Sequence, residues 1–216
     1  MKIGIFDSGK GGTTTMAAIK KLLPNEEYFY ISDRENHPYG DKTDTELHQI
    51  VAANVAKLQT WGADLIVIAC NTATTKCIKK LRLNYPEIIF VGIEPAIKPA
   101  AESGAKNILV LATTNTAQSA SVHNLINKNL KPDQNITVLA CPGLADAIEL
   151  DDKRQIRTLL DALLKDINTP DIIVLGCTHY SLIKNEIQAY FPNAKLIDGN
   201  DGVARHVYAL IKNLPF

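Results

Sequence analysis

The sequence predicts an α/β protein with two pseudosymmetric domains, each a doubly wound parallel sheet covered by helices. Short apolar runs alternate with amphipathic stretches along the chain, which is typical of β-α-β units. Similar segments also recur about half a chain length apart, so we expect one α/β unit used twice. The 216 residues are enough for one large domain or two small ones, and the repeat favours two.

The predicted strands are short runs rich in Ile, Val and Leu, separated by helical patterns. In the first half of the chain they cover residues 2–6, 28–32, 65–69 and 88–93. In the second half they cover residues 107–112, 136–140, 172–176 and 195–197. The clearest helical patterns cover residues 14–23, 45–61 and 72–83, and several such patterns end at Pro or Gly.

The strongest match within the chain joins two strands that both follow an aspartate and end in a cysteine. Residues 64–70 (DLIVIAC) match residues 171–177 (DIIVLGC) at an offset of 107 residues, and the opening strand matches residues 108–113 at an offset of 106. Chance similarity is the alternative, because strands are generally rich in Ile, Val and Leu. The acid, the strand length, the cysteine and the following helix all keep register, and we therefore interpret the match as a duplication.

The repeat also predicts where the domains and the ligand site lie. We expect a first domain over residues 1–97 and a second over residues 98–200, with a hinge near residues 94–105. The segment 201–216 looks helical and is predicted to return to the first domain. Ligands of open α/β sheets bind at the carboxyl ends of the strands. Two facing domains would therefore enclose the active site in the cleft between them.

Composition and charge exclude several classes of protein. Lys plus Arg equals Asp plus Glu, at 23 each, so the chain has no basic field for nucleic acid or for an anionic membrane. No apolar run approaches the roughly 20 residues that span a bilayer, and the N-terminal residues lack the apolar core of a signal peptide. Four cysteines without a Cys-x-x-Cys pair suit a reducing compartment. We expect a cytoplasmic protein.

Cys70 and Cys177 are the first candidate functional residues. Each is predicted to close a buried strand and to open a helix, where the helix N-terminus lowers the pKa of a thiol. A single cysteine at a strand end is usually a small packing residue. Two at duplicated positions, each followed by hydrogen-bonding residues, favour a functional pair. Packing explains Cys77 and Cys141 adequately.

The opening strand leads into a glycine-rich turn, residues 7–13. Its glycines leave backbone N–H groups bare, so that an anion could approach them closely. The turn imitates a nucleotide-binding P-loop, but Gly11 stands where that motif needs Ser or Thr, and Gly4 lies inside the strand. Asp7 has two interpretations: it caps the following helix, or it orients a thiol or binds a substrate ammonium.

Two further motifs have both a structural and a functional interpretation. His179 could bond to the backbone at a helix start, or act as general base or thiolate partner for Cys177. Residues 38–40 form a tight turn by composition, and as part of a site they would offer the Tyr39 phenol and the Gly40 amide. The pair Cys177-x-His179 supplies only two metal ligands and the other histidines show no paired spacing, so no metal site is predicted.

Together these motifs resemble the glutamate racemase family. Residues 6–12 (FDSGKGG) are similar to that family's FDSGxGG opening, and the resemblance runs from residue 3 to about residue 210. The other similar motifs are Pro38-Tyr39-Gly40 (PYG), Ala69-Cys70-Asn71-Thr72-Ala73 (ACNTA), Thr113-Thr114-Asn115-Thr116 (T-x-x-T), Cys141-Pro142 followed by Glu149 (CP…E), and Gly176-Cys177-Thr178-His179-Tyr180 (GCTHY).

The resemblance implies an isomerase that interconverts L- and D-glutamate without a cofactor and supplies D-glutamate for peptidoglycan synthesis. It implies that Cys70 and Cys177 are the acid/base pair, with Asp7 and His179 as their catalytic partners. The implied substrate contacts are Asp7, Ser8, Tyr39, Gly40, Asn71, Thr72, Thr178 and His179, with Thr113, Thr116 and Glu149 in support.

Three other functions and the oligomeric state stay open. The chain could be a racemase of the same family for aspartate or another amino acid, or a hydrolase or lyase that uses Cys177 with His179. It could also be a ligand-binding protein that kept the fold without catalysis. Members of the family usually continue further beyond Arg205, and Ser181 replaces their usual Pro. The sequence therefore does not decide between a monomer and a homodimer, or the strictness of the choice of glutamate.

Overall fold

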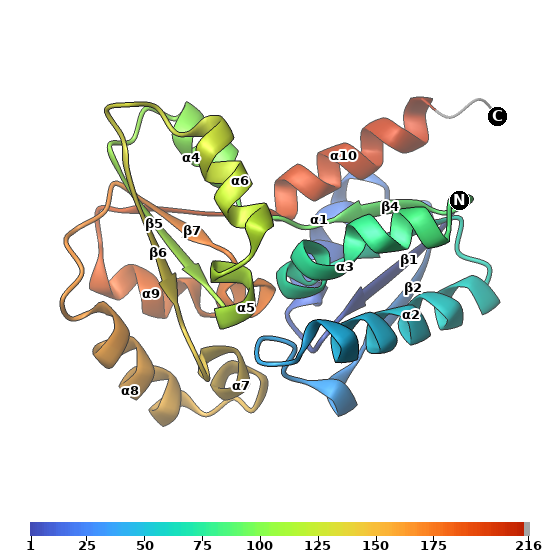
Figure 1. Cartoon of the computed structure of the whole chain (residues 1–216), viewed down its shortest axis with the longest axis horizontal. Helices are drawn as coiled ribbons and strands as arrows, with labels where there is room; N and C mark the ends of the chain where they lie inside the picture. The colour runs from blue at the N-terminus through green and yellow to red at the C-terminus, as the bar shows by residue number, and fades with distance from the viewer. Residues whose placement is uncertain (214–216) are drawn as a thin grey trace.

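The computed structural model describes residues 1–213 and contains two parallel four-stranded sheets (Figure 1). The strand orders, β2-β1-β3-β4 and β6-β5-β7-β8, are the same order used twice. The strands of the first sheet are β1 (Lys2–Asp7), β2 (Glu27–Ser32), β3 (Leu65–Ile68) and β4 (Ile89–Gly92). Those of the second are β5 (Asn107–Ala112), β6 (Asn135–Ala140), β7 (Ile172–Leu175) and β8 (Lys195–Asp198). The predicted fold class, two doubly wound α/β sheets, is confirmed.

The helices follow the strands in the alternation that the sequence predicts. In the first half of the chain they are α1 (Gly12–Leu22), α2 (Asp44–Thr60), α3 (Asn71–Asn84), α4 (Ile97–Glu102) and the short 3₁₀ helix η1 (Arg34–Asn36). In the second half they are α5 (Thr114–Ala117), α6 (Ala120–Asn129), α7 (Leu144–Glu149), α8 (Lys153–Leu164), η2 (Thr178–Ile183, 3₁₀), α9 (Lys184–Tyr190) and α10 (Asn200–Asn213). Cys177 thus precedes a 3₁₀ turn, and the α-helix predicted after it begins only at Lys184.

Both faces of each sheet are covered, which explains why the strands are apolar throughout. Successive side chains of a strand point to opposite faces: Ile5 packs with α1 and α10, whereas Phe6 packs with α2 and α3. In the second sheet, Leu109 packs with α7, α8 and α9, whereas Val110 packs with α4 and α6. Each sheet is therefore the middle of three layers. A ligand can reach it at the carboxyl ends of its strands, which the helices do not cover.

The helix α10 packs on the first sheet although it follows the second in the chain (Figure 1). Val207 and Ile211 are buried in the same apolar cluster as Ile5. At the start of the helix, the amide of Asn200 accepts a hydrogen bond from the Thr15 hydroxyl at 2.7 Å. The predicted helical segment 201–216 extends beyond the described residues, which end at 213.

The segment predicted as the hinge, residues 94–105, contains α4. Its Ile97 and Ala100 pack against Val110 of the second sheet. The chain crosses between the two sheets twice, once before α4 and once before α10. The hinge and the domain limits at residues 97 and 200 stay predictions. Among residues 1–213, no helix combines the length and the apolar character that crossing a bilayer requires.

Candidate active site

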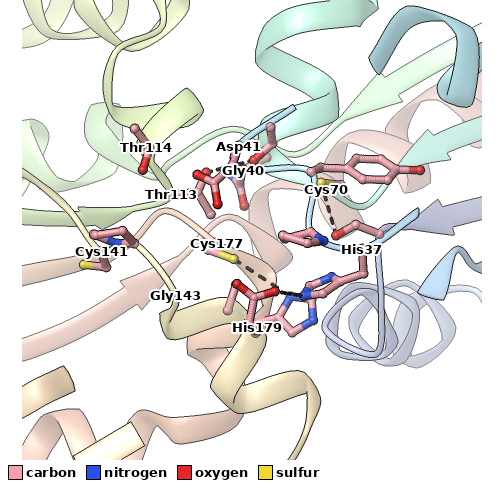
Figure 2. A pocket seen from close by; sticks show the side chains of 18 of the residues that line it. His37, Gly40, Asp41, Cys70, Thr113, Thr114, Cys141, Gly143, Cys177 and His179 are labelled. Atoms are coloured by element: carbon pink, nitrogen blue, oxygen red, sulfur yellow. Dashed lines mark hydrogen bonds and ion pairs between the residues drawn. The ribbon is translucent and has the colours of Figure 1, made fainter. Parts of the chain in front are cut away.

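A cavity lies where the carboxyl ends of the two sheets meet (Figure 2). From the first half of the chain it is lined by Ser8, His37, Pro38, Tyr39, Gly40, Asp41, Cys70, Asn71 and Thr72. From the second half it is lined by Thr113, Thr114, Cys141, Pro142, Gly143, Ala145, Asp146, Cys177, Thr178 and His179. The structure therefore brings Cys70 and Cys177 into one cavity from equivalent positions of the two sheets.

Cys70 lies between β3 and α3 and is held as a thiol. Its side chain is 5% exposed, and its Sγ donates to the Ser8 hydroxyl across 3.8 Å. Burial, and then the neighbouring Asp7 carboxylate, raise the pKa of Cys70 well above its ordinary range. The backbone N–H of Ala73 in the first turn of α3 lowers the pKa of this thiol, as predicted, but desolvation of the thiolate outweighs it, so the predicted net lowering is wrong.

Cys177 has a different partner, the imidazole of His179. Its Sγ lies 3.9 Å from Nδ1 of His179, whose Nε2 lies 2.9 Å from a carboxylate oxygen of Glu149. Burial lowers the pKa of His179, but its hydrogen bonds to Cys177 and Glu149 outweigh burial and raise this pKa to about 10. The ring is thus charged at neutral pH and lies against the sulfur of Cys177.

The carboxylate of Glu149 lies on the far side of His179 from Cys177. It accepts hydrogen bonds from the backbone N–H of Lys10 at 2.8 Å and from His179. It also pairs with Nε of Arg34 at 2.8 Å. Burial raises the pKa of Glu149, but these hydrogen bonds and the charges of His179 and Arg34 outweigh burial and lower it to about 2. Glu149 therefore contacts a cavity residue, although it does not itself line the cavity.

The pair of Glu149 and His179 predicts a pH-dependent stability. The pKa of His179 is raised from 6.5 to about 10, so its contribution is complete below pH 6.5 and is lost as the pH rises to about 10. The pKa of Glu149 is lowered from 4.5 to about 2, so its contribution is complete above pH 4.5 and is lost toward pH 2. We expect His179→Gln to reduce the free energy of unfolding most between about pH 4.5 and 6.5. Urea unfolding from pH 5 to pH 10 measures this, and a reduction that stays constant would contradict it.

Asp7 is completely buried at the end of β1 and joins both halves of the chain. Its carboxylate accepts the N–H of Gly12 at 2.8 Å and of Gly9 at 3.3 Å. The hydroxyl of Thr178, from the second half, donates to it at 3.4 Å. Burial is the main cause that raises the pKa of Asp7. Asp7 does not line the cavity, but it is bonded to Thr178 and adjacent in sequence to Ser8, which do.

The glycine-rich turn binds carboxylates of the protein itself. Its N–H groups donate to Asp7 and Glu149, so the anion that the sequence led us to expect is supplied by these two side chains. The glycines also allow the second half to approach closely. A Cβ on Gly11 would lie 2.6 Å from the backbone nitrogen of His179, and one on Gly9 would lie 2.5 Å from Glu149. The turn thus has no resemblance in role to a P-loop.

Three threonine hydroxyls form a triangle across the cavity wall. The hydroxyl of Thr72 lies 2.9 Å from that of Thr113 and 3.2 Å from that of Thr116, and these last two lie 3.1 Å apart. Thr72 lies in the first turn of α3, Thr113 caps α5 and Thr116 lies within α5, so the triangle holds α3 beside α5 (Figure 1). Thr72 and Thr113 line the cavity, whereas Thr116 is fully buried behind them.

The turn at Tyr39 and Gly40 lines the cavity, but not with its phenol. The Tyr39 hydroxyl donates to Asp33 at 2.6 Å and accepts from the Asn54 amide at 3.1 Å. Burial and the hydrogen bond to Asp33 raise the pKa of Tyr39 well above its ordinary range. The expectation that this turn offers a phenol to a ligand is therefore wrong, since the hydroxyl is already bonded within the first half of the chain.

Sequence reasoning missed four charged or reactive residues in or near the cavity: His37, Cys141, Asp146 and Arg34. His37 was set aside for lack of paired spacing, yet its Nε2 lies 3.1 Å from Asp146 and its ring centroid 5.1 Å from that of His179. Cys141 was explained by packing, yet it lines the cavity. Arg34 reaches Glu149. His37 directly precedes the PYG turn, and this position could have marked it as a site residue. The other contacts join residues that are distant in the sequence, so no local pattern predicts them.

The described residues, 1–213, hold no group of three or more His, Cys, Asp or Glu side chains arranged for a metal ion. All four cysteines of the chain are free thiols.

Comparison with known proteins agrees with this geometry. The family model described as Asp/Glu/Hydantoin racemase matches residues 17–207. The glutamate racemase of Sulfurovum sp. (strain NBC37-1) is 38% identical over 97% of this chain and 82% of its own length. That of Halothermothrix orenii is 39% identical over 98% and 85%, respectively. The crystal structure of Escherichia coli glutamate racemase in complex with L-glutamate and the activator UDP-MurNAc-ala superposes with a TM-score of 0.88, at 32% identity, over 98% of this chain and 82% of that one.

A more distant structure, Picrophilus torridus aspartate racemase, shares the fold with a TM-score of 0.64 at 21% identity. The match of the family model includes both strand-end cysteines and every strand except β1, and relatives 38% and 39% identical cover nearly the whole chain. This chain therefore belongs to the Asp/Glu/Hydantoin racemase family, a family of isomerases.

Proposed function

We propose that the protein interconverts L- and D-glutamate without a cofactor, using Cys70 and Cys177 on opposite faces of the substrate. The observation that carries this proposal is that two thiols from equivalent strand ends enter one cavity from opposite sheets. The relatives named glutamate racemase, at 38% and 39% identity, support the choice of substrate.

Racemisation needs a base on one face of Cα and an acid on the other. A thiolate takes the Cα proton from one side, and the opposite thiol gives its proton to the resulting carbanion. One cysteine ends as a thiol and the other as a thiolate, so the reverse reaction exchanges their roles. A single base would have to carry its proton around the substrate, whereas a duplicated fold supplies two nearly symmetric groups.

The partners of the two cysteines favour one resting arrangement. Cys70 is held as a thiol by burial and by Asp7, whereas the sulfur of Cys177 lies 3.9 Å from Nδ1 of His179. Cys70 is thus placed to act as the acid, with Cys177 opposite it as the base. Turnover of the other enantiomer requires the opposite assignment, with Cys70 as the base and Cys177 as the acid.

The Cα proton is far less acidic than a thiol, so the site must stabilise the developing negative charge. Asn71, Thr72 and Thr113 line the cavity with an amide and hydroxyls that can donate to a carboxylate. Donors fixed in a site that excludes water act strongly on a transition state, and removing one such donor costs on the order of 10²- to 10³-fold in rate. All three side chains are buried, as such a site requires.

The resemblance to the glutamate racemase family also suggests a biological role. D-glutamate produced in this way would supply peptidoglycan synthesis, in the cytoplasm.

Separate incubations with L-glutamate, L-aspartate and L-alanine test the substrate, with the enantiomers resolved by chiral chromatography. We expect D-glutamate to form with the highest kcat/KM of the three products. Faster formation of D-aspartate would assign the protein to a different member of the family. If none of the three forms its enantiomer, the proposed function fails.

A further inference from the structure

Arg34 lies outside the cavity, yet it contacts the group that orients His179. Its Nε lies 2.8 Å from Oε1 of Glu149, while Oε2 of the same carboxylate accepts from Lys10 and His179. The contacts run in one line from Arg34 through Glu149 and His179 to Cys177. Arg34 belongs to the first half of the chain and the other three residues belong to the second, so this line crosses between the halves.

The turn that carries Arg34 is fixed by a buried carboxylate, that of Asp33. Its oxygens accept from the Tyr39 hydroxyl at 2.6 Å and from the amides of Asn54 and Asn36, each at 2.8 Å. The backbone N–H of Asp33 donates to the carbonyl of Asp7 at 2.9 Å. The position of η1 is therefore fixed by hydrogen bonds that do not involve Glu149. A residue that positions another must itself be held in this way.

Burial and close contacts restrict the movement of the Glu149 carboxylate. Its side chain is 9% exposed, and Gly9 leaves no room for a Cβ on the side that faces it. Arg34 is the partner of Oε1, whereas Lys10 and His179 share Oε2. Without Arg34 one oxygen loses its partner, and the carboxylate can rotate away from His179.

A second ion pair joins the same segments: Lys10 pairs with Asp151 at 2.6 Å. Burial and the neighbouring His179 lower the pKa of His37, so its ring, whose Nε2 lies 3.1 Å from Asp146, is neutral at neutral pH. Together with Arg34 and Glu149, two basic side chains of the first half face two acidic side chains at the end of α7 and just after it. The segment 149–151 is thus docked by complementary charge, and Glu149 is the better buried of its two acids.

We propose that Arg34 is a positioning residue for the reaction: from the first half of the chain it fixes Glu149 where that carboxylate orients His179 toward the sulfur of Cys177. This inference rests on the proposed racemase function. It gives an arginine that does not line the cavity a part in the chemistry, and it makes the Cys177 side of the site complete only when the two halves are in contact.

The test is a double-mutant cycle between Arg34→Gln and Glu149→Gln. We expect Arg34→Gln to lower kcat about 5- to 50-fold and to change KM less than about threefold, because misplacing a catalytic group by about 1 Å costs about 10²-fold and this pair is partly exposed. Arg34→Lys keeps the charge and should recover part of the loss. In the Glu149→Gln background, Arg34→Gln should cost nothing more. Arg157→Gln, which removes an exposed pair with Asp161 on α8, is the matched control and should leave kcat unchanged.

A second readout does not depend on activity. The imidazole nitrogen resonances of His179, assigned by comparison with His179→Gln, should shift in Arg34→Gln in the same direction as in Glu149→Gln. An unmoved His179 resonance in Arg34→Gln would overturn the inference, as would an equal further loss of kcat in the Glu149→Gln background. If the wild-type protein racemises no amino acid, the proposed function has failed, and the resonances of His179 still decide whether Arg34 positions it.

Discussion

Replacing either Cys70 or Cys177 with alanine is expected to lower kcat for glutamate racemisation by about 10²- to 10⁴-fold, because a positioned acid or base contributes that much. Each direction of the reaction needs one cysteine as base and the other as acid, so neither can substitute for its partner. The measurement is formation of D-glutamate from L-glutamate and of L-glutamate from D-glutamate with each variant.

Cys77→Ala is the matched control for this experiment. Cys77 is a buried thiol on α3, two turns from Cys70, and it does not line the cavity. Its replacement should leave kcat near that of the wild type. A Cys-His hydrolase or lyase would instead need Cys177 but not Cys70. Activity of Cys70→Ala close to that of Cys77→Ala would therefore contradict the two-thiol account.

Replacing Gly11 with alanine is expected to lower kcat/KM by about 10²-fold or more, since a displacement of about 1 Å at a reacting group can cost that much. The backbone of Gly11 has φ −58° and ψ −37°, which alanine adopts freely. The effect is therefore steric. A Cβ would lie 2.6 Å from both the backbone nitrogen of His179 and the hydroxyl of Thr178. The backbone contact cannot be relieved by a rotamer change, so the segment that follows Cys177 must move away from Asp7.

Gly202→Ala provides the comparison, because a Cβ there meets no atom within 4 Å and the residue lies on α10. This replacement should leave kcat/KM unchanged and stabilise the helix by up to about 1 kcal/mol. Urea unfolding of both variants separates a loss of activity from a loss of folding. Wild-type kcat/KM in Gly11→Ala would show that the close approach of the two halves is not needed for the reaction.

Much of the fold could be predicted because it depends on local pattern. The strands before Cys70 and Cys177 are continuous apolar runs, since both faces of their sheets are covered. Their equal spacing revealed the repeat, and the repeat placed both cysteines at equivalent strand ends. The boundaries of α1, α2 and α3 also follow closely from the periodicity of the sequence.

The properties of the site were harder to predict because they depend on contacts between distant residues. Tyr39 bonds to Asp33 and Asn54, and only the fold shows that its phenol is unavailable to a ligand. A helix N-terminus lowers the pKa of a thiol, but burial raises the pKa of Cys70 by more, and only the fold shows how deeply this thiol is buried. Arg34 and Glu149 are 115 positions apart in the sequence, and no periodic pattern connects them.

The structure also qualifies the symmetry that the repeat suggests. Cys70 and Cys177 occupy equivalent positions, but Ser8 and Asp7 accompany the first, whereas His179 and Glu149 accompany the second. L- and D-glutamate require only the reacting groups to be symmetric. The different partners surround the two sulfurs with different charges: a carboxylate lies near Cys70, and an imidazole lies beside Cys177.

The use of two thiols is tested most directly by racemising L-glutamate in D₂O to low conversion and measuring deuterium at Cα in each enantiomer. If one cysteine removes the proton and the other delivers a solvent-derived one, nearly all the D-glutamate formed carries deuterium while the remaining L-glutamate keeps its protium. Deuterium appearing equally in both enantiomers from the start, or protium retained in the D-glutamate, would indicate a single shared base and would contradict this account.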